Sequence, residues 1–281
     1  MDLNRINFKN IPVQAGIISD IIKLEVDSNN CFQMLDDLIS SDQGVASLVL
    51  RVVNSPFYNR GNKVTTIPFA ISLLGYSVVR SLALLAFSRS LFSHTKNEQF
   101  RLHIWQHSLL TALASQNICE ELGNKKLNDE AFIAGLMHDT GKVLMFNHNP
   151  ALYQDVFKFA FTNNCTSVEA EHHYFGFDHC QVGAEAVKEW KLPQRFNDYM
   201  AVDLSTPPTT PLKDTVLICL MSGNYLLKAA GIGGIEIDDH ELKISSLLGL
   251  GLSDLLCENL LHEKYIDSLM EHETYKLCAS I

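Results

Sequence analysis

The 281-residue sequence has no excess of basic residues. Its 22 Lys and Arg residues stand against 32 Asp and Glu residues, which gives a formal net charge of −10. Binding to a phosphate backbone relies on a cationic surface that releases counterions, and no run of Lys or Arg provides one. We therefore do not expect direct nucleic-acid binding. An effect on gene expression would act through another protein.

Long apolar runs are also missing. The longest, such as Leu82 to Phe87 and Val216 to Met221, are far shorter than the roughly 20 residues that a membrane helix needs. The first five residues, Met1 to Arg5, lack the apolar core of a signal peptide. The seven cysteines form no CxxC pair and are odd in number, which favours reduced thiols over a disulfide framework. These features predict a soluble, cytoplasmic protein with no membrane segment.

Several catalytic motifs are absent. The sequence contains no GxSxG elbow, no P-loop and no GxGxxG that follows a strand and opens a helix. The turn at Gly231-Ile232-Gly233-Gly234 lacks that context, and Ile235 to Ile237 is the best, but weak, candidate for a strand. We therefore expect neither a sheet-based hydrolase nor a nucleotide-binding α/β domain.

Helical periodicity dominates what is present. Apolar residues recur at steps of three and four, which is typical of amphipathic helices. Asp42, Asn128 and Asp178 are suitable N-cap residues, and Gly75 and Gly123 are suitable helix ends. The expected helices cover residues 32–39, 45–53, 67–74, 78–92, 100–122, 129–137, 153–163, 168–174, 179–190, 215–230, 242–248 and 253–270. The pattern predicts an all-α protein with an N-terminal lobe (1–96), a second helical lobe (97–230) and a C-terminal helical extension (231–281).

A His–Asp pair is the most informative local feature. His138 and Asp139 end the apolar run that begins at Ala131, and Gly141 follows, where we expect the chain to turn. Such a pair at the end of a buried helix can direct one nitrogen and one oxygen ligand into a common cavity. His107 lies on another expected helix, and His172, His173 and His179 cluster further along the chain. Three separate helical segments could therefore bring histidine and carboxylate ligands together.

Simpler interpretations of these residues remain open. His107 lies mid-helix and could be an ordinary hydrogen-bonded core histidine. The His138-Asp139 pair could simply end a helix, with the imidazole near the negative pole of the helix dipole. His172 and His173 are adjacent, so at most one of them can face a given site on a helix.

Distributed motifs give the sequence a resemblance to a known family. Around the His–Asp pair, Trp105-x-His107-Ser108 and Ala134-Gly-Leu-Met-His138-Asp139-x-Gly141-Lys142 resemble the HD superfamily of metal-dependent phosphohydrolases. Further matching positions are Ile11-Pro12, Asp42, Leu50-Arg51-x-x-Asn54-Ser55, Phe57, Ile67-x-x-Ala70-Ile71, Leu74-Gly75, Glu171, Phe175-Gly176, Asp178-His179, Val182-Gly-Ala184, Trp190 and Leu192-Pro193. Over residues 8–230 the chain resembles the HDOD domain, the HD-related output domain of bacterial signalling proteins. This implies an HD-like helical bundle with the N-terminal lobe packed on it.

The resemblance implies a metal site built from a His, a His–Asp pair and a later Asp. The first three positions fall on His107, His138 and Asp139, but Asn224 stands at the position of the later Asp. An amide is a weaker ligand than a carboxylate. The set is therefore incomplete unless His179 or Asp203 compensates. Imidazole and carboxylate ligands suit Fe, Mn, Zn or Ni.

Two functional hypotheses follow. In the first, the chain is a regulatory or signal-transduction module that is non-catalytic or has a degenerate metal site, and it acts on a signalling protein or a small phosphorylated ligand. HDOD domains are generally regarded as non-catalytic, which favours this hypothesis. In the second, the chain is a metal-dependent phosphohydrolase for a nucleotide or another phosphoester, and Lys142 steadies the developing charge. The oligomeric state is open.

Overall fold

The computed structural model describes residues 3–8, 15–24, 30–56, 58–59, 61, 63–92, 95, 97–205, 208 and 211–279. Every regular element within these residues is a helix, which confirms the predicted all-α class. Ile11, Pro12 and Phe57, which contribute to the resemblance, lie outside the described residues. So do Ser93, His94 and Lys96, near the expected boundary between the lobes.

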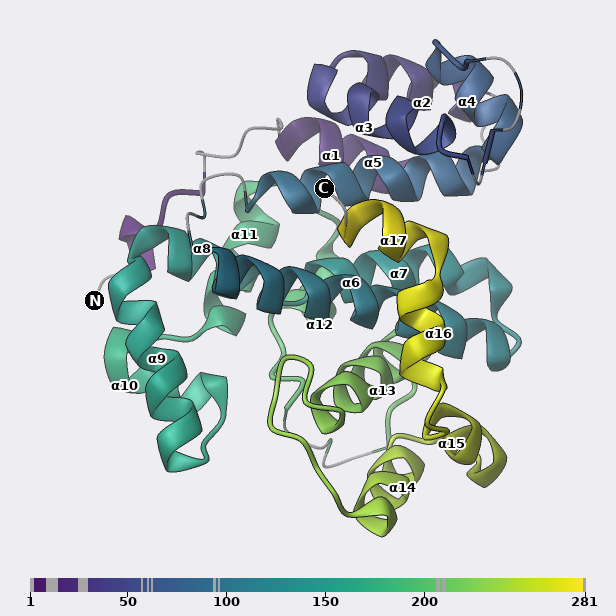
Figure 1. The fold of residues 1–281 in the computed structure, drawn as a ribbon. Coiled ribbons are helices and arrows are strands. Elements are labelled where there is room, and N and C mark those ends of the chain that lie inside the picture. Colours follow the sequence, from purple (N-terminus) through teal and green to yellow (C-terminus); the bar gives the residue numbers. More distant parts are fainter. Residues whose placement is uncertain are drawn as a thin grey trace.

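The N-terminal helices form one layer at an end of the molecule (Figure 1). They are α1 (Ala15–Lys23), α2 (Cys31–Ser40), α3 (Gln43–Val53), α4 (Ile67–Leu74) and α5 (Tyr76–Ser90). As predicted, the Asp42 carboxylate caps α3 by accepting the backbone N–H groups of Gly44 and Val45 at 2.9 and 3.0 Å. Helix α3 packs on α4 and α5, and α5 in turn contacts α7 of the next layer.

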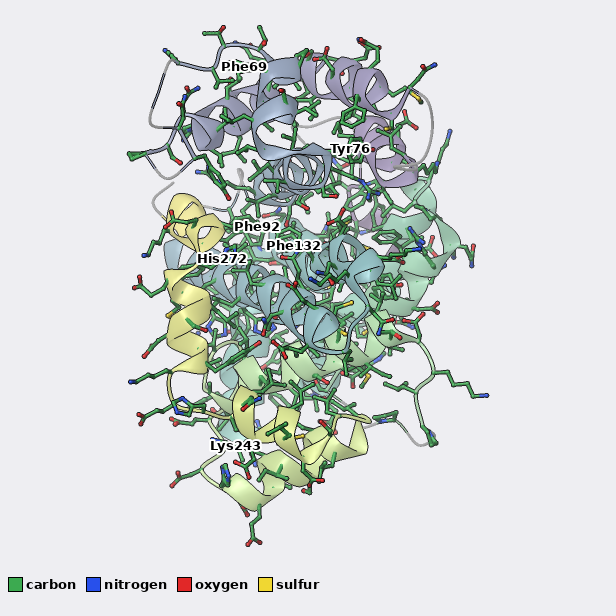
Figure 2. All side chains as sticks on the ribbon, turned by 90° about the vertical axis from the view of Figure 1, so that its right-hand side faces the viewer. Phe69, Tyr76, Phe92, Phe132, Lys243 and His272 are labelled. Carbon is green, nitrogen blue, oxygen red and sulfur yellow. The ribbon has the colours of Figure 1, made fainter. Side chains whose placement is uncertain are left out.

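The central layer is organised by three helices that pack on one another: α6 (Glu98–Glu121), α7 (Asn128–Met137) and α13 (Thr215–Ala229). Around them lie α8 (Thr140–His148), α9 (Pro150–Asn163), α10 (Ser167–Phe175), α11 (His179–Glu189) and α12 (Asn197–Met200). The buried aromatic residues Phe92 and Phe132 lie where this layer meets the N-terminal one (Figure 2). The apolar core continues from one layer into the other.

Of the C-terminal helices, the last two run along one side of the central layer, and the first two lie at the end of the molecule opposite the N-terminal layer (Figure 1). They are α14 (His240–Gly249), α15 (Asp254–Leu260), α16 (Tyr265–Glu271) and α17 (Glu273–Ala279), and α16 and α17 both contact α6. The predicted single helix over 253–270 is therefore wrong, because residues 261–264 form turns that separate α15 from α16. Ile235 to Ile237, the weak strand candidate, belongs to the loop before α14.

Two other local predictions were also wrong. Helix α8 was not anticipated, because it is buried on all sides from Thr140 to Phe146 and its sequence shows no amphipathic stripe. Asn128 does not cap α7: it is the first helical residue, and its side chain makes no capping hydrogen bond. The predicted caps at Asp178 and the helix end at Gly123, with φ of 77°, are both present.

No helix in the described part of the chain is long and apolar enough to span a bilayer. The six cysteines whose side chains are described are free thiols, consistent with the expected absence of a disulfide framework.

Candidate functional site

The His138–Asp139 pair lies where two buried helices meet. His138 follows the last residue of α7, with its backbone N–H still bonded to the Ala134 carbonyl at 3.0 Å, and α8 begins directly after Asp139. His138 is 5 % exposed and Asp139 is 3 % exposed. The Asp139 carboxylate makes no capping bond to α8. It is therefore available to groups from other helices.

Gly141 does not turn the chain, and that expectation was wrong. The residue lies in the first turn of α8, where a Cβ atom would be 2.0 Å from the backbone oxygen of His179. Only glycine allows α8 and α11 to approach so closely. This contact places the start of α11, and with it His179, beside Asp139.

Three imidazoles surround the Asp139 carboxylate. The Nε2 atom of His138 lies 3.5 Å from Oδ1, that of His107 lies 3.9 Å from Oδ2, and that of His179 lies 4.0 Å from Oδ1. One ligand atom from each of His107, His138 and Asp139 lies within 4.8 Å of the others, a grouping that could hold a metal ion. Residues from α6, the α7–α8 junction and α11 thus meet around one carboxylate.

A lysine ammonium group already occupies one side of that carboxylate. Lys142 Nζ lies 2.9 Å from Oδ1 and 3.0 Å from Oδ2 of Asp139, and the lysine is 3 % exposed. Burial lowers the pKa of Lys142, but Asp139 and Glu171 together outweigh burial and the pKa is raised. Burial raises the pKa of Asp139, but its neighbours, with His138 and Lys142 foremost, hold that pKa well below its ordinary value. The two groups therefore form a charged, buried ion pair at neutral pH.

His138 has a nitrogen with no hydrogen-bond partner. Its Nδ1 lies 2.7 Å from the Gly135 carbonyl, which makes Nδ1 the protonated nitrogen of a neutral ring. Burial lowers the pKa of His138 to about 4, so the ring is neutral at pH 7. Its Nε2 is buried without a partner among the described residues. The unpaired lone pair of His138 Nε2 therefore faces Asp139. Histidines that bind a metal through Nε2 usually donate their Nδ1–H to a carbonyl or carboxylate, as His138 does.

His107 lies between two hydrogen-bond acceptors. Its Nδ1 is 3.0 Å from the Ile232 carbonyl, and its Nε2 is 3.1 Å from Oδ1 of Asn224. Burial lowers the pKa of His107 well below its ordinary value, so the ring carries only one N–H. Turning the Asn224 amide would not help, because its Nδ2 already donates to the Leu204 carbonyl at 3.2 Å. One donor is missing at this position, and a cation, a proton or a water molecule would have to supply it.

His179 has a different environment. Its Nδ1 and its backbone N–H both bond Oε2 of Glu171, at 2.6 and 2.8 Å, and Tyr153 donates its hydroxyl to the other oxygen of that carboxylate. Burial lowers the pKa of His179, but Glu171 outweighs it and raises the pKa to about 10. The ring is therefore an imidazolium at neutral pH, with no lone pair to offer a metal. Glu171 was not predicted as a site residue: its helix also carries Glu169, His172 and His173, and the family resemblance was the only signal that singled it out.

The segment after α13 covers His107. Gly233 has φ of 81°, and a Cβ atom there would lie 2.4 Å from His107 Nδ1. Lys228 at the end of α13 donates to Ser205 Oγ at 2.8 Å, and burial together with Lys142 lowers its pKa to about 8. The Gly231–Gly234 turn, which has no phosphate-binding context in the sequence, thus supports the ring of His107.

Other predicted participants lie elsewhere. His172 and His173 are exposed on α10, and His172 pairs with Asp178 at 2.7 Å. Asp203 is half-buried in the loop after α12 and, among the residues that the structure describes, belongs to no group that could hold a metal. Neither adjacent histidine therefore joins the Asp139 centre.

Comparison with known proteins gives one family match and several similar folds. The sequence pattern of the HDOD domain matches residues 11–204. A protein of Treponema pallidum (strain Nichols), described as uncharacterized, is 21 % identical over 157 residues, which are 56 % of this chain but only 30 % of that protein.

Solved structures share the fold at low identity. An HDOD domain protein of unknown function from Geobacter sulfurreducens has a TM-score of 0.71 at 22 % identity, over 94 % of this chain and 90 % of its own. A candidate signal transduction protein from Marinobacter aquaeolei VT8 has a TM-score of 0.75 at 22 % identity, over 99 % of this chain and 64 % of its own. A candidate phosphohydrolase from Shewanella amazonensis SB2B has a TM-score of 0.67 at 20 % identity, over 97 % of this chain and 95 % of its own. At these identities the structures establish a shared fold and no shared activity.

Proposed function

Because this chain belongs to the HDOD family, we propose that it is a regulatory or signal-transduction module that acts through a partner protein or a small phosphorylated ligand. In this proposal, its histidine–aspartate centre does not turn over a substrate. The observation that carries the proposal is the position of Lys142, whose ammonium group bonds both oxygens of Asp139. The one carboxylate in the metal-type group is thus already neutralised by the chain itself.

The charges at this centre oppose a resident dication. Lys142 and His179 are both cationic and both lie within 4.0 Å of Asp139. Two unit charges 4 Å apart repel by about 4 kcal/mol at an effective dielectric constant of about 20, and a dication doubles that figure. Asn224, where the family pattern implies a carboxylate, adds no negative charge. The nitrogen and oxygen ligand atoms suit a transition metal, but the positive charges of Lys142 and His179 oppose one.

A metal-dependent phosphohydrolase is the second candidate, and one feature favours it. The lone pair of His138 Nε2 and the missing donor at His107 both face the group that could hold an ion. His107, His138 and Asp139 would hold Fe, Mn, Zn or Ni, with Asn224 Oδ1 as a weak further ligand. Such an ion supplies Lewis acidity toward phosphoryl oxygen and an acidified water. Lys142 would then have to leave Asp139.

Two measurements on the purified chain and its His138→Ala variant separate these functions. The first is elemental analysis, and the second is a hydrolysis screen of nucleotides and cyclic dinucleotides. We expect less than one metal ion per chain and no turnover in either protein. Stoichiometric metal with hydrolysis in the wild type, both lost in His138→Ala, would establish the enzyme instead. His240→Ala is the matched control, because this histidine is exposed on α14 and takes no part in the centre.

A further inference from the structure

Large apolar side chains gather on the outer surface of the N-terminal layer. Phe32 on α2 is 57 % exposed, and Phe69 and Leu73 on α4 are 50 % and 45 % exposed. Helices α2 and α4 pack on each other, and Figure 2 shows Phe69 near the outer end of this layer, away from the central layer. Exposed apolar residues that occur singly are ordinary, but a group of them usually marks an interaction site.

Helix α4 has the composition of a helix that is covered on both faces. Its eight residues include no charged side chain. Its inner face contributes Ala70 and Ile71 to the core, while Phe69 and Leu73, one helical turn apart, lie on the exposed face. The exposed face of a surface helix normally carries charged or polar residues. The outer face of α4 is therefore better suited to an apolar partner than to water.

A groove runs between α2 and α4. Its volume is about 300 Å³, and it is lined by Phe32, Gln33 and Asp36 from α2 and by Pro68, Ile71 and Ser72 from α4. This volume is at the lower limit of small-molecule sites, which usually measure about 300–1,000 Å³. The Phe32 ring packs edge-to-face on the buried ring of Tyr76, with 5.6 Å between the ring centroids, and this contact holds the exposed aromatic in place. The groove therefore fits a few side chains of a larger partner.

The charge beside the groove is negative. Asp36 lines the groove, Asp37 follows it on α2, and these two are the only charged residues of α2 and α4. Their carboxylates accept hydrogen bonds from Ser40 and Gln33, at 3.0 and 2.8 Å, and form no ion pair with any described residue. A partner that matches this surface therefore carries a Lys or Arg next to its apolar residues.

A second copy of this chain does not provide that positive charge. If two copies met symmetrically through this face, each would bring Asp36 and Asp37 toward the same residues of the other. Leu255, which is 74 % exposed, lies on α15 with Asp254 and Glu258, so docking α15 of one copy on the groove of another would also bring acids together. The same acids oppose docking on an anionic membrane surface. The charge therefore favours a different protein.

We propose that the groove between α2 and α4 binds an amphipathic helix of a partner protein. Apolar side chains of that helix lie in the groove and against Phe69 and Leu73, and a Lys or Arg of that helix pairs with Asp36. Helix-in-groove recognition uses apolar anchors at positions i, i+3, i+4 and i+7 of the bound helix. The inference rests on the proposed function for the role of such a partner. The groove shares no residue with the Asp139 centre, so a failure to bind a helix leaves the metal and turnover results unaffected.

Fluorescence anisotropy of two labelled synthetic peptides, each titrated with the full chain at physiological salt, tests this inference. Each peptide is a helix of about 16 residues with leucines at positions i, i+3, i+4 and i+7. The polar face carries lysines in one peptide and glutamates in the other. We expect saturable binding of one lysine peptide per chain, at least about tenfold tighter than binding of the glutamate peptide.

Two pairs of variants separate the groove from general attraction to an acidic chain. Phe69→Gln removes an exposed apolar side chain and should weaken binding of the lysine peptide about 5- to 20-fold. Leu255→Gln removes an exposed apolar side chain on α15 and should bind like the wild type. Asp36→Asn removes the charge but can still accept the Ser40 hydroxyl, and it should weaken binding about 2- to 5-fold. Glu258→Gln makes the same change of charge on α15 and should have no effect.

The inference is wrong if neither peptide binds, if the glutamate peptide binds as tightly as the lysine peptide, or if Phe69→Gln binds the lysine peptide like the wild type. Two further measurements address the other occupants. A dimer in sedimentation velocity that Phe69→Gln dissociates would assign the groove to a second copy. Binding to vesicles of phosphatidylcholine and phosphatidylglycerol that Phe69→Gln abolishes would assign it to a membrane. We expect neither result.

Discussion

Replacing Lys142 with Met is the most direct test of the charge argument. The substitution keeps most of the side-chain volume but removes the ammonium group that bonds both oxygens of Asp139 at 2.9 and 3.0 Å. A buried carboxylate is then left without its partner, which typically costs about 3–5 kcal/mol. We expect Lys142→Met to be markedly less stable than the wild type in metal-free buffer and to bind a divalent metal more tightly.

The size of the gain follows from Coulomb's law. A dication on the far side of Asp139 would lie about 4–5 Å from Lys142 Nζ, and the repulsion at an effective dielectric constant of about 20 is roughly 7 kcal/mol. Movement of the lysine would relieve part of this repulsion. If half of it acts in the wild type, the variant gains about 3.5 kcal/mol, or roughly two to three orders of magnitude in affinity.

Competition with a chelator measures the affinity for Mn²⁺ and Zn²⁺, and thermal unfolding with and without metal provides a second readout. A metal that binds only the folded chain stabilises it by RT ln(1 + [L]/Kd), where [L] is the free metal concentration, and so raises its melting temperature. Lys142→Arg, which keeps the charge, and Lys158→Met, which removes an exposed lysine of the same spacing, should both behave like the wild type. Equal metal affinity in Lys142→Met and wild type would refute the reasoning.

Three further predictions concern the same centre. Asn224→Asp places a carboxylate at the position 3.1 Å from His107 Nε2 and should raise the metal content found by elemental analysis. An unchanged metal content would argue that position 224 is not a ligand position. Because the pKa of His179 is raised to about 10 in the folded state from about 6.5 when unfolded, its pairing with Glu171 stabilises the fold fully below pH 6.5 and is lost as the pH rises through 10. Urea unfolding should therefore show the wild type losing a few kcal/mol more than His179→Gln between pH 7 and 10, and parallel pH profiles would contradict this. Gly233→Ala puts a Cβ atom 2.4 Å from His107 at a φ of 81° and should cost about 2 kcal/mol or more in the same assay, whereas Gly249→Ala, with open space around it, should cost little; equal losses would show that the turn does not support His107.

The sequence by itself determined the helical class and many helix ends. Asp42 and Asp178 cap helices because a carboxylate satisfies N–H groups only two or three residues away, so the signal is local. Gly75 and Gly123 adopt positive φ for the same local reason. The proximity of His107 to the His138–Asp139 pair could be expected from the family resemblance alone. The spacing of these residues did not require it.

Only the tertiary structure decided how the charges at the centre are balanced. Whether Lys142 reaches solvent, a phosphate or Asp139 depends on what buries it, and burial comes from α8 packing against α9 and α11. Likewise, His179 lies beside Asp139 because a glycine at 141 lets α8 approach α11, a contact between residues 38 positions apart. Residue type sets which interactions a side chain can make. The packing of helices that are distant in the sequence sets which of these interactions the side chain makes, because burial and charge act through space.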